Sequence, residues 1–220
     1  MNRWILVLVI LITGSVIYGQ SDSIERHLFY KKLSDKQISQ DEFSRKWKEW
    51  NTRIKEIKNY PDLPVDKNGQ VHYSFINEYS NQGKNLLFTR TLEWLAINYG
   101  LIPAYIYSSR EDGKIIFRNN TNFSNGTTCN YTSILTIDSG KILTEFISIG
   151  YQKPVDEEYP GDIADRSVSF SISQVIPVIY KKPAEWDYYL ELLRLTNSYF
   201  RGENENHRLY IMSYDSAYKF

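Results

Sequence analysis

Two glycine turns between residues 103 and 151 constrain the fold of this chain more than any other feature. Asp112-Gly113 separates the segments "PAYIYSS" and "KIIFRNN", and Ser139-Gly140 separates "CNYTSILTID" and "KILTEFISIGY". Short pairs ending in glycine, between runs rich in β-branched and aromatic residues, are typical of antiparallel hairpins. The sequence therefore predicts two consecutive hairpins in one antiparallel sheet.

A strand and a helix are expected before these hairpins. The segment "LPVDKNGQVHYSF" contains an Asn-Gly turn, followed by Val71, Tyr73 and Phe75 on one strand face. "KNLLFTRTLEWLAINYG" then has apolar residues at helical spacing, and Gly100 is placed to end the helix. In the last strand before residue 152, Leu143, Ile147 and Ile149 predict one mostly apolar side.

A long helix is expected after an acidic, proline-containing surface loop at residues 152–168. Pro183 is a favourable first helical residue, and Gly202, just after Arg201, resembles a helix stop. The order of strand, helix, four strands and long helix predicts an α+β domain over residues 61–204, with an antiparallel sheet. Residues 205–220 are expected to form a C-terminal tail.

The N-terminal 19 residues have the pattern of a secretory signal peptide. Arg3 precedes nine consecutive apolar residues, and Gly19 is suited to a cut before Gln20. A membrane anchor is the competing interpretation, but a spanning helix needs about 20 apolar residues and Gly14 interrupts this run. We therefore expect an exported protein, periplasmic or secreted, with no stable membrane anchor after leader removal.

Residues 20–60 predict a helical hairpin. Ser39 and Glu42 have the spacing of a capping box. Behind them, an apolar seam recurs at spacings of three and four residues on a charged helix. The seam consists of Phe43, Trp47, Trp50, Ile54 and Ile57. Either the seam packs on the rest of the protein, or Trp47 and Trp50 form an interface for another protein.

The segments "LPVDKNGQVHYSF", "TLEWLA" and "EDGKIIFRNN" together resemble an uncharacterised family of exported bacterial proteins. That family is a domain of unknown function with a fold like the TATA-box-binding protein (TBP-like). The resemblance covers residues 61–152, or reaches 204 if the final helix belongs. The matching positions are turn and core residues: Pro64, Gly69, Val71, Tyr73, Trp94 and Gly113. The resemblance implies a β-α-β4-α sheet domain with a long C-terminal helix, and no catalytic residues.

The charge of the chain gives no support for nucleic-acid binding. Basic and acidic residues number 26 each, and loss of the leader with its single Arg3 leaves 25 basic residues against 26 acidic. Proteins that bind DNA on a sheet of this kind need a basic concave surface and apolar wedges. A nucleic-acid partner is therefore not expected.

Residues for catalysis or metal binding are not grouped in the sequence. His27, His72 and His207 are far apart, and no hydrolase, phosphate-loop or dinucleotide motif occurs. We therefore expect no enzyme activity, no metal and no cofactor. The single cysteine, Cys129, has no internal disulfide partner, so it is either a buried thiol or forms an intermolecular disulfide.

Two function classes are left open by the sequence. The first is a non-enzymatic protein-interaction or structural module of the cell envelope, which would bind a protein partner through Trp47 and Trp50. The alternative is a carrier of a small apolar ligand or lipid, held in a cavity between the sheet and the C-terminal helix. The candidate cavity residues are Phe146, Ile149, Trp186, Tyr189 and Leu193.

Overall fold

The protein was analysed as a computed structural model, in which two compact units are distinguished. The described residues are 31–54, 61, 63–65, 70–100, 104–154, 167–176 and 178–217. The helical unit comprises residues up to Gly69 together with Ser173–Arg194, and the sheet unit comprises Gln70–Ile172 together with the chain from Leu195. The predicted leader lies outside the described residues. So do most of the first helix of the predicted hairpin and residues 155–166 of the predicted surface loop.

In the helical unit, the main helix before the sheet is α3, Gln40–Ile54. The backbone N–H of Glu42 donates a 3.1 Å hydrogen bond to Ser39 Oγ, which is the side-chain cap expected from the sequence. Trp50 on α3 is fully buried and meets the edge of Trp186, with 5.3 Å between the ring centroids. This tryptophan is therefore part of the core of the helical unit. The short helices of the C-terminal half are α5 (Ile172–Val175), η1 (Val178–Tyr180) and η2 (Pro183–Glu185).

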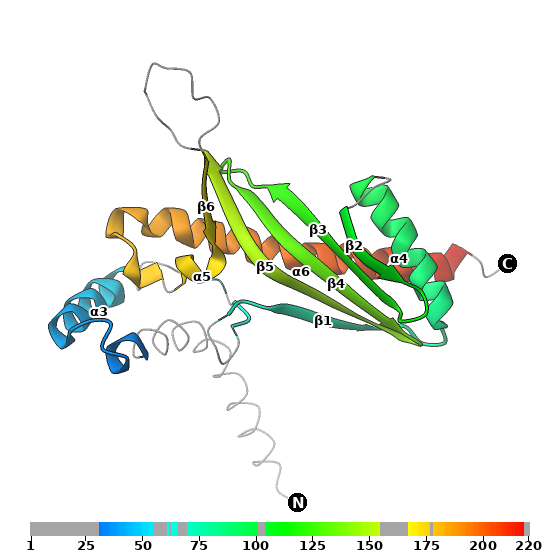
Figure 1. Cartoon of the computed structure of the whole chain (residues 1–220), viewed down its shortest axis with the longest axis horizontal. Helices are drawn as coiled ribbons and strands as arrows, with labels where there is room; N and C mark the ends of the chain where they lie inside the picture. The colour runs from blue at the N-terminus through cyan, green and yellow to red at the C-terminus, as the bar shows by residue number, and fades with distance from the viewer. Residues whose placement is uncertain are drawn as a thin grey trace, which may run out of the picture. The chain divides into compact units, whose positions relative to one another are not determined.

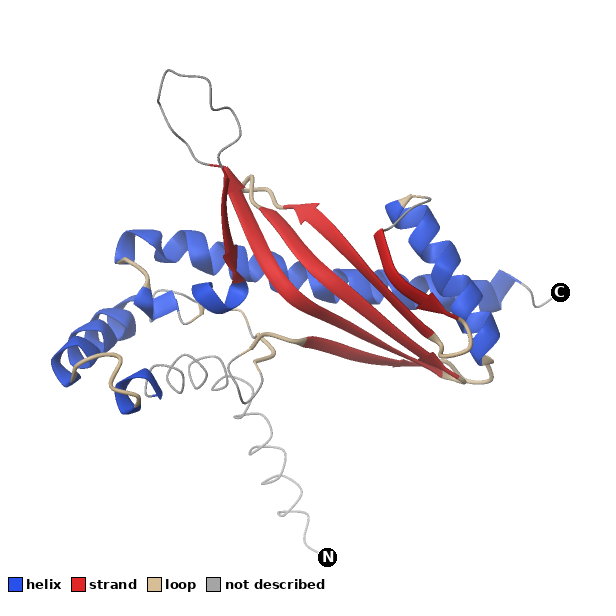
Figure 2. Cartoon of the chain, in the orientation of Figure 1, coloured by secondary structure: helices blue, strands red, loops and turns tan. Residues whose placement is uncertain are grey.

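The described residues of the sheet unit form a sheet of six antiparallel strands (Figures 1 and 2). The first, β1 (Tyr73–Glu78), is followed by helix α4 (Lys84–Tyr99). Four strands come next: β2 (Ala104–Ser109), β3 (Lys114–Asn122), β4 (Thr128–Asp138) and β5 (Lys141–Pro154). Their spatial order is β1-β5-β4-β3-β2, and the short β6 (Ser167–Ser171) also pairs with β5.

Both predicted glycine turns are present. Gly113 and Gly140 have φ angles of 68° and 76°, a left-handed region that favours glycine. Helix α4 also has the predicted limits, and Gly100 at its end has a φ of 80°. The α+β class with an antiparallel sheet and a long C-terminal helix is therefore confirmed.

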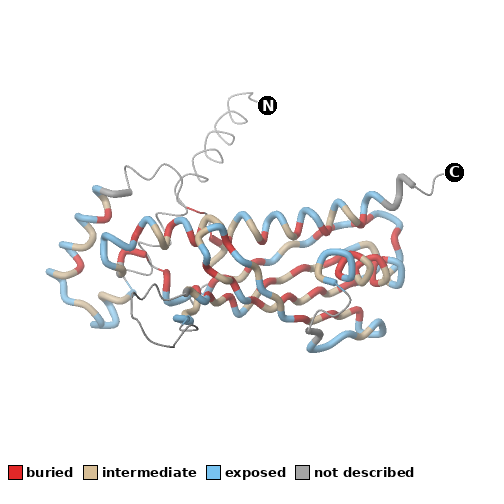
Figure 3. The backbone as a smooth tube through the Cα atoms, turned by 90° about the horizontal axis from the view of Figure 1, so that it is seen from above, coloured by how far each residue is buried: buried red, intermediate tan, exposed pale blue. Residues whose placement is uncertain are grey.

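The two described helices of the sheet unit, α4 and the later part of α6 (Trp186–Ala217), pack on the same face of the sheet. In Figure 1, this part of α6 passes behind the strands. One core cluster joins apolar side chains from α4, α6 and the strands, among them Leu95, Ile211 and Phe117. A second group of rings surrounds Phe200 of α6, which stacks on Phe146 of β5 at 4.6 Å between centroids. In Figure 3, buried positions alternate with intermediate and exposed positions along the strands.

Strand β5 changes the face toward which its side chains point. Thr132 of β4 is opposite Ile147, but Asn130, two residues earlier, is opposite Gly150, three residues later. One extra residue is thus accommodated in β5, and Ser148 there has a φ of 54°. Because of this bulge, Ile149 is buried on the helix-covered face. The predicted common apolar side of Leu143, Ile147 and Ile149 is therefore wrong.

Helix α6 extends well past its predicted end. Gly202 lies within the helix, which continues to Ala217, so the predicted tail at 205–220 is helical through most of its length. The residues buried in the sheet unit recur at spacings of three and four: Thr196, Phe200, Asn204, His207 and Ile211. A glycine inside a helix costs only about 1 kcal/mol relative to alanine. The packing of this buried stripe outweighs that cost.

Candidate interaction surface

The face of the sheet opposite α4 and α6, here called the open face, carries an apolar patch. Within the sheet unit, neither described helix packs on it. Cross-strand pairing aligns Tyr107, Ile116 and Ile134 in one row across β2, β3 and β4. A second row passes from Thr136 to Leu143 and Ile76 on β1. Directly opposed residues of antiparallel strands share a face, so these side chains form one continuous surface.

The apolar side chains of the open face are more exposed to solvent than those of the covered face. Ile76 is 68% exposed and Tyr107 is 41% exposed, whereas the helix-covered Ile115 and Ile142 are fully buried. Ile116, Ile134, Leu143 and Ile147 have intermediate exposure. Contiguous exposed apolar groups on a sheet are a feature of interaction sites.

Charged side chains lie on either side of the patch with opposite sign. Lys114 and Arg118 are on β3, two residues before and two after Ile116. Glu145 is on β5, in the row of Ile116 and Ile134. On the open face of β4, which lies between these strands, the residues from Asn130 to Thr136 are uncharged.

Glu145 also has a neighbour on the same face. His72 Nε2 lies 3.0 Å from Glu145 Oε1, and both side chains are partly exposed. The two atoms are at ion-pair distance, although their geometry is not that of a hydrogen bond. Arg118 is exposed and forms no ion pair with any residue in the described part of the chain.

A polar cluster on the covered face has a different character. The Tyr99 hydroxyl donates to the Glu203 carboxylate, and the hydroxyls of Tyr131 and Tyr199 lie 2.7 Å apart. Burial raises the pKa of all three tyrosines and also raises the pKa of Glu203. The raised pKa values keep the phenols protonated near neutral pH, so their hydroxyls remain available as hydrogen-bond donors. The cluster links α4, β4 and α6 through buried side-chain hydrogen bonds.

Cys129 is fully buried, and burial raises the pKa of its thiol to about 12. The structure agrees with the buried-thiol interpretation, because a protonated thiol without solvent access is a poor nucleophile and a poor disulfide partner. Among the described residues, no group of three or more His, Cys, Asp or Glu side chains is arranged to hold a metal ion.

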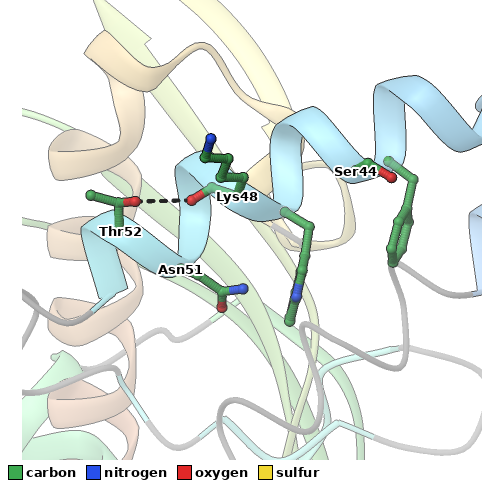
Figure 4. Close-up of a pocket in the computed structure, with 6 residues that line it drawn as sticks. Ser44, Lys48, Asn51 and Thr52 are labelled. Atoms are coloured by element: carbon green, nitrogen blue, oxygen red, sulfur yellow. Dashed lines mark hydrogen bonds between the residues drawn. The ribbon is translucent and has the colours of Figure 1, made fainter.

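A hollow of about 400 Å³ lies along α3 in the helical unit (Figure 4). The residues that line it are Phe43, Ser44, Trp47, Lys48, Asn51 and Thr52. The Thr52 hydroxyl donates a 3.0 Å hydrogen bond to the Lys48 carbonyl across one helical turn. All lining residues belong to a single helix, so the hollow is a surface feature of α3 and lies outside the predicted space between sheet and helix.

The two predicted interface tryptophans have different positions. Trp50 is buried against Trp186, which makes it unsuitable as an exposed contact. Trp47 has intermediate exposure and stacks near Phe43, at 6.2 Å between ring centroids. The seam predicted as an interface is thus partly core.

The candidate cavity residues fall in both units. Phe146 and Ile149 are buried in the sheet unit, where the ring of Phe200 stacks on Phe146. Trp186 and Leu193 are buried in the helical unit, and the Lys181 ammonium lies 4.8 Å from the centroid of the Tyr189 ring. The four buried side chains serve as core residues in their own units.

The open face was missed by reasoning from sequence, although one signal was available. In "KILTEFISI" the residues Leu143 and Ile147 alternate with Ile142 and Phe146, so both sides of β5 are apolar. A strand that is apolar on both sides is expected to be covered on both faces. The described helices of the sheet unit cover only one.

Two solved structures of bacterial proteins are similar to this chain. One is a crystal structure of a TBP-like protein from Parabacteroides distasonis, with a TM-score of 0.54 and 19% sequence identity. The similarity covers 67% of this chain and 96% of that one. The fold is TBP-like.

The other solved structure is a DUF4468 family protein from Bacteroides ovatus, with a TM-score of 0.50 and 13% identity. Here the similarity covers 68% of this chain and 90% of that one. No protein-family model and no curated protein sequence matches this chain. At these identities the similarity establishes the TBP-like fold alone, and fold does not determine function.

No helix in the described residues is both long enough and apolar enough to cross a lipid bilayer.

Proposed function

We propose that this chain is a non-enzymatic protein-interaction module of the bacterial cell envelope, and that the open face of its TBP-like sheet binds a protein. The observation that carries the proposal is the pair of apolar rows on this face. Tyr107, Ile116 and Ile134 form the first row, and the neighbouring row contains Leu143 and Ile76, which is 68% exposed. When a partner binds, the apolar surface of these side chains is removed from water. This burial favours binding by about 25 cal/mol for each Å² of apolar area.

The chemistry of the open face favours a protein over nucleic acid. Lys114 and Arg118 are offset by Glu145 on the same face, so the surface has no strong positive potential for a phosphate backbone. Apolar residues in the centre with charged residues at the margin are the arrangement found in protein interfaces.

Export is the second part of the proposal, and it rests on the apolar N-terminal segment of the sequence. Fractionation of the native cells, followed by determination of the N-terminal residue of the mature chain, tests it. A chain that begins near Gln20 in the periplasmic or secreted fraction supports export. An intact N-terminus in the cytoplasm contradicts it.

A carrier of small apolar ligands has less support. The ring of Phe146, a candidate cavity residue, is in contact with Phe75, Tyr131 and Phe200, so its surroundings are filled by aromatic side chains. Native mass spectrometry of the protein purified from its own cells distinguishes the two functions. A bound mass of a few hundred daltons, lost on denaturation, would favour the carrier.

Site-specific photo-crosslinking in cells tests the interaction function. A benzophenone side chain replaces Ile76 on the open face, and the matched control places it at Leu209, which is 50% exposed on α6. We expect one reproducible protein adduct from position 76 that the further substitution Ile134→Glu abolishes. Equal adducts from both positions, or none from position 76, would contradict the proposal.

A further inference from the structure

We propose that the partner of the open face is a second copy of this chain, packed face to face about a two-fold axis parallel to β4. This inference rests on the proposed function, because it names the partner of the same surface. It follows from the distribution of charge across three neighbouring strands, β3, β4 and β5.

Near the middle of the open face, charges of opposite sign lie on the two sides of β4. Lys114 and Arg118 lie one strand to one side, and Glu145 lies one strand to the other. Lys141, at the start of β5 on the same face, is 3.9 Å from Asp138 of β4. Neighbouring strands are spaced about 4.8 Å apart, so the two sets of charges lie at about the same distance from β4. A two-fold axis along β4, midway between two facing sheets, therefore places β5 of one copy over β3 of the other.

The register of the strands then decides which side chains meet. Glu145 is in the same row as Ile116, through Ile134 on β4. The axis preserves position along the strand, so Glu145 of the second copy lies over Ile116 of the first. Lys114 and Arg118 flank that point at about 7 Å along the strand, a distance that their long side chains span. Each glutamate is thus placed between two basic residues, and the contact occurs twice.

The alternative two-fold axis, perpendicular to the strands, would place like charges over like. Glu145 would then lie over β5 of the other copy, and Lys114 and Arg118 over β3. Opposed like charges across an interface are unfavourable. Charge complementarity therefore selects the axis along β4.

Uncharged residues occupy the centre of the proposed interface. Ile134 lies on the axis, between Thr132 and Thr136, so β4 of one copy faces β4 of the other with no charge buried between these positions. Two sheets packed in this way lie about 10 Å apart, with their strands within about 30° of each other. This is the arrangement of a β-sandwich core.

The area of the open face is sufficient for a dimer. Five strands are about 24 Å wide, and strands of six to eleven residues are about 20 to 37 Å long, which gives about 500 to 900 Å². Specific interfaces bury about 800 Å² on each partner. Strands β1 to β5 at their full lengths together cover about 750 Å², which is close to that value.

Charge reversal tests the inference. The protein used is the mature chain purified from its own cells. Sedimentation velocity between 1 and 100 μM protein is expected to show a dimer for the wild type. Glu145→Lys alone, and Lys114→Glu with Arg118→Glu, should each raise the dissociation constant at least tenfold, because each homodimer then opposes like charges at both contacts. Arg201→Glu, an exposed change on α6, is the matched control and should leave it unchanged.

Mixing the two charge variants gives the decisive measurement. In one contact of the mixed pair, the lysine introduced at position 145 faces the two glutamates introduced at positions 114 and 118. In the other contact, the native Glu145 faces the native Lys114 and Arg118. The mixture should therefore dimerise within about threefold of the wild type. A monomeric wild type at 100 μM, or folded variants that fail to pair when mixed, overturns the inference.

Crosslinking separates this result from failure of the proposed function. An adduct from position 76 with twice the mass of the chain supports a second copy. An adduct with a different protein, together with a monomeric wild type, retains the interaction function and overturns self-association. No adduct at all overturns both.

Discussion

The side-chain amide of Asn77 donates a 2.7 Å hydrogen bond to the side-chain oxygen of Asn204 and so joins β1 to α6 within the sheet unit. Both residues are buried. The bond connects positions 127 residues apart in the sequence. Polar groups in such a position are satisfied only when the strand and helix adopt a single relative register.

Substitution of either asparagine by alanine is expected to destabilise the protein by about 1–3 kcal/mol, because the other amide is left buried without its partner. The double substitution Asn77→Ala with Asn204→Ala should cost less than the sum of the two single changes. Urea denaturation of the four proteins in the cycle measures the coupling. Strictly additive losses would show that the hydrogen bond contributes nothing.

His207 gives the protein a specific sensitivity to acid. Burial lowers the pKa of this side chain to about 4, and its Nε2 lies 3.2 Å from the Thr91 hydroxyl. The unfolded chain binds a proton at this residue more readily than the folded protein does. The stability contribution is therefore complete above pH 6.5 and is lost as the pH falls toward 4, by about 3 kcal/mol in total.

The variant His207→Gln removes this titration. Its free energy of unfolding, measured by urea denaturation between about pH 7.5 and 4, should fall by about 3 kcal/mol less than that of the wild type. Other titrating groups cancel in the difference between the two proteins. Parallel pH profiles would contradict the lowered pKa.

Glu203 should produce the opposite pH dependence. Its pKa is raised by burial, so the folded protein holds a proton on this carboxyl more readily than the unfolded chain, whose pKa is 4.5. Stability therefore falls as the pH rises above 4.5, until the carboxyl of the folded protein is also ionised.

Glu203→Gln keeps an oxygen that accepts the hydrogen bond from Tyr99 and removes the charge. We expect the variant to be at least as stable as the wild type at about pH 7 and less pH-dependent above 4.5. Thermal unfolding at a series of pH values measures both. A variant that is markedly less stable at neutral pH would show that the ionised carboxylate stabilises the cluster.

Gly113 should tolerate no side chain. A Cβ at this position would lie 2.1 Å from the Ile137 carbonyl oxygen, and the residue also has a φ of 68°. Gly126, with a φ of 76° and no atom within 4 Å of such a Cβ, is the matched control. Gly126→Ala should cost about 1–2 kcal/mol for the left-handed conformation alone.

Gly113→Ala combines that conformational cost with a backbone clash. We expect it to destabilise the protein by more than about 3 kcal/mol, or to prevent folding. Denaturant titration of Gly113→Ala and Gly126→Ala separates the cost of the clash from the cost of the left-handed conformation. Equal losses at both glycines would show that the β2–β3 turn relaxes around the added methyl group.

The parts of the fold that were predictable from sequence depend on local signals. Helix α4 has the predicted limits because Gly100 ends it, and the hairpin turns are correct because glycine is needed at positive φ. The predicted end of α6 was wrong because Gly202 resembles a helix stop but lies inside the helix. The contacts that carry the helix past it, such as those of His207 with Thr91 and Trp94, join residues more than 100 positions apart.

The candidate surface was harder to predict for a related reason. Trp47 and Trp50 form a regular seam in the sequence, but only the tertiary structure shows that Trp50 is covered by Trp186. The open face depends on which side of the sheet the helices occupy, and a strand pattern alone does not contain that information.

The bulge at Ser148 divides β5 into two halves that have different partners and different alternation of their side chains. Its first half pairs with β1 and its second half with β6. Even-numbered residues such as Phe146 point toward the core before the bulge, and odd-numbered residues such as Ile149 do so after it. In evolutionary terms, the length of this segment is more tightly constrained than the identity of the exposed residue at the bulge. Loss of a single residue between the halves would turn Ile149 and Tyr151 outward, whereas most substitutions at the bulge itself would leave both in place.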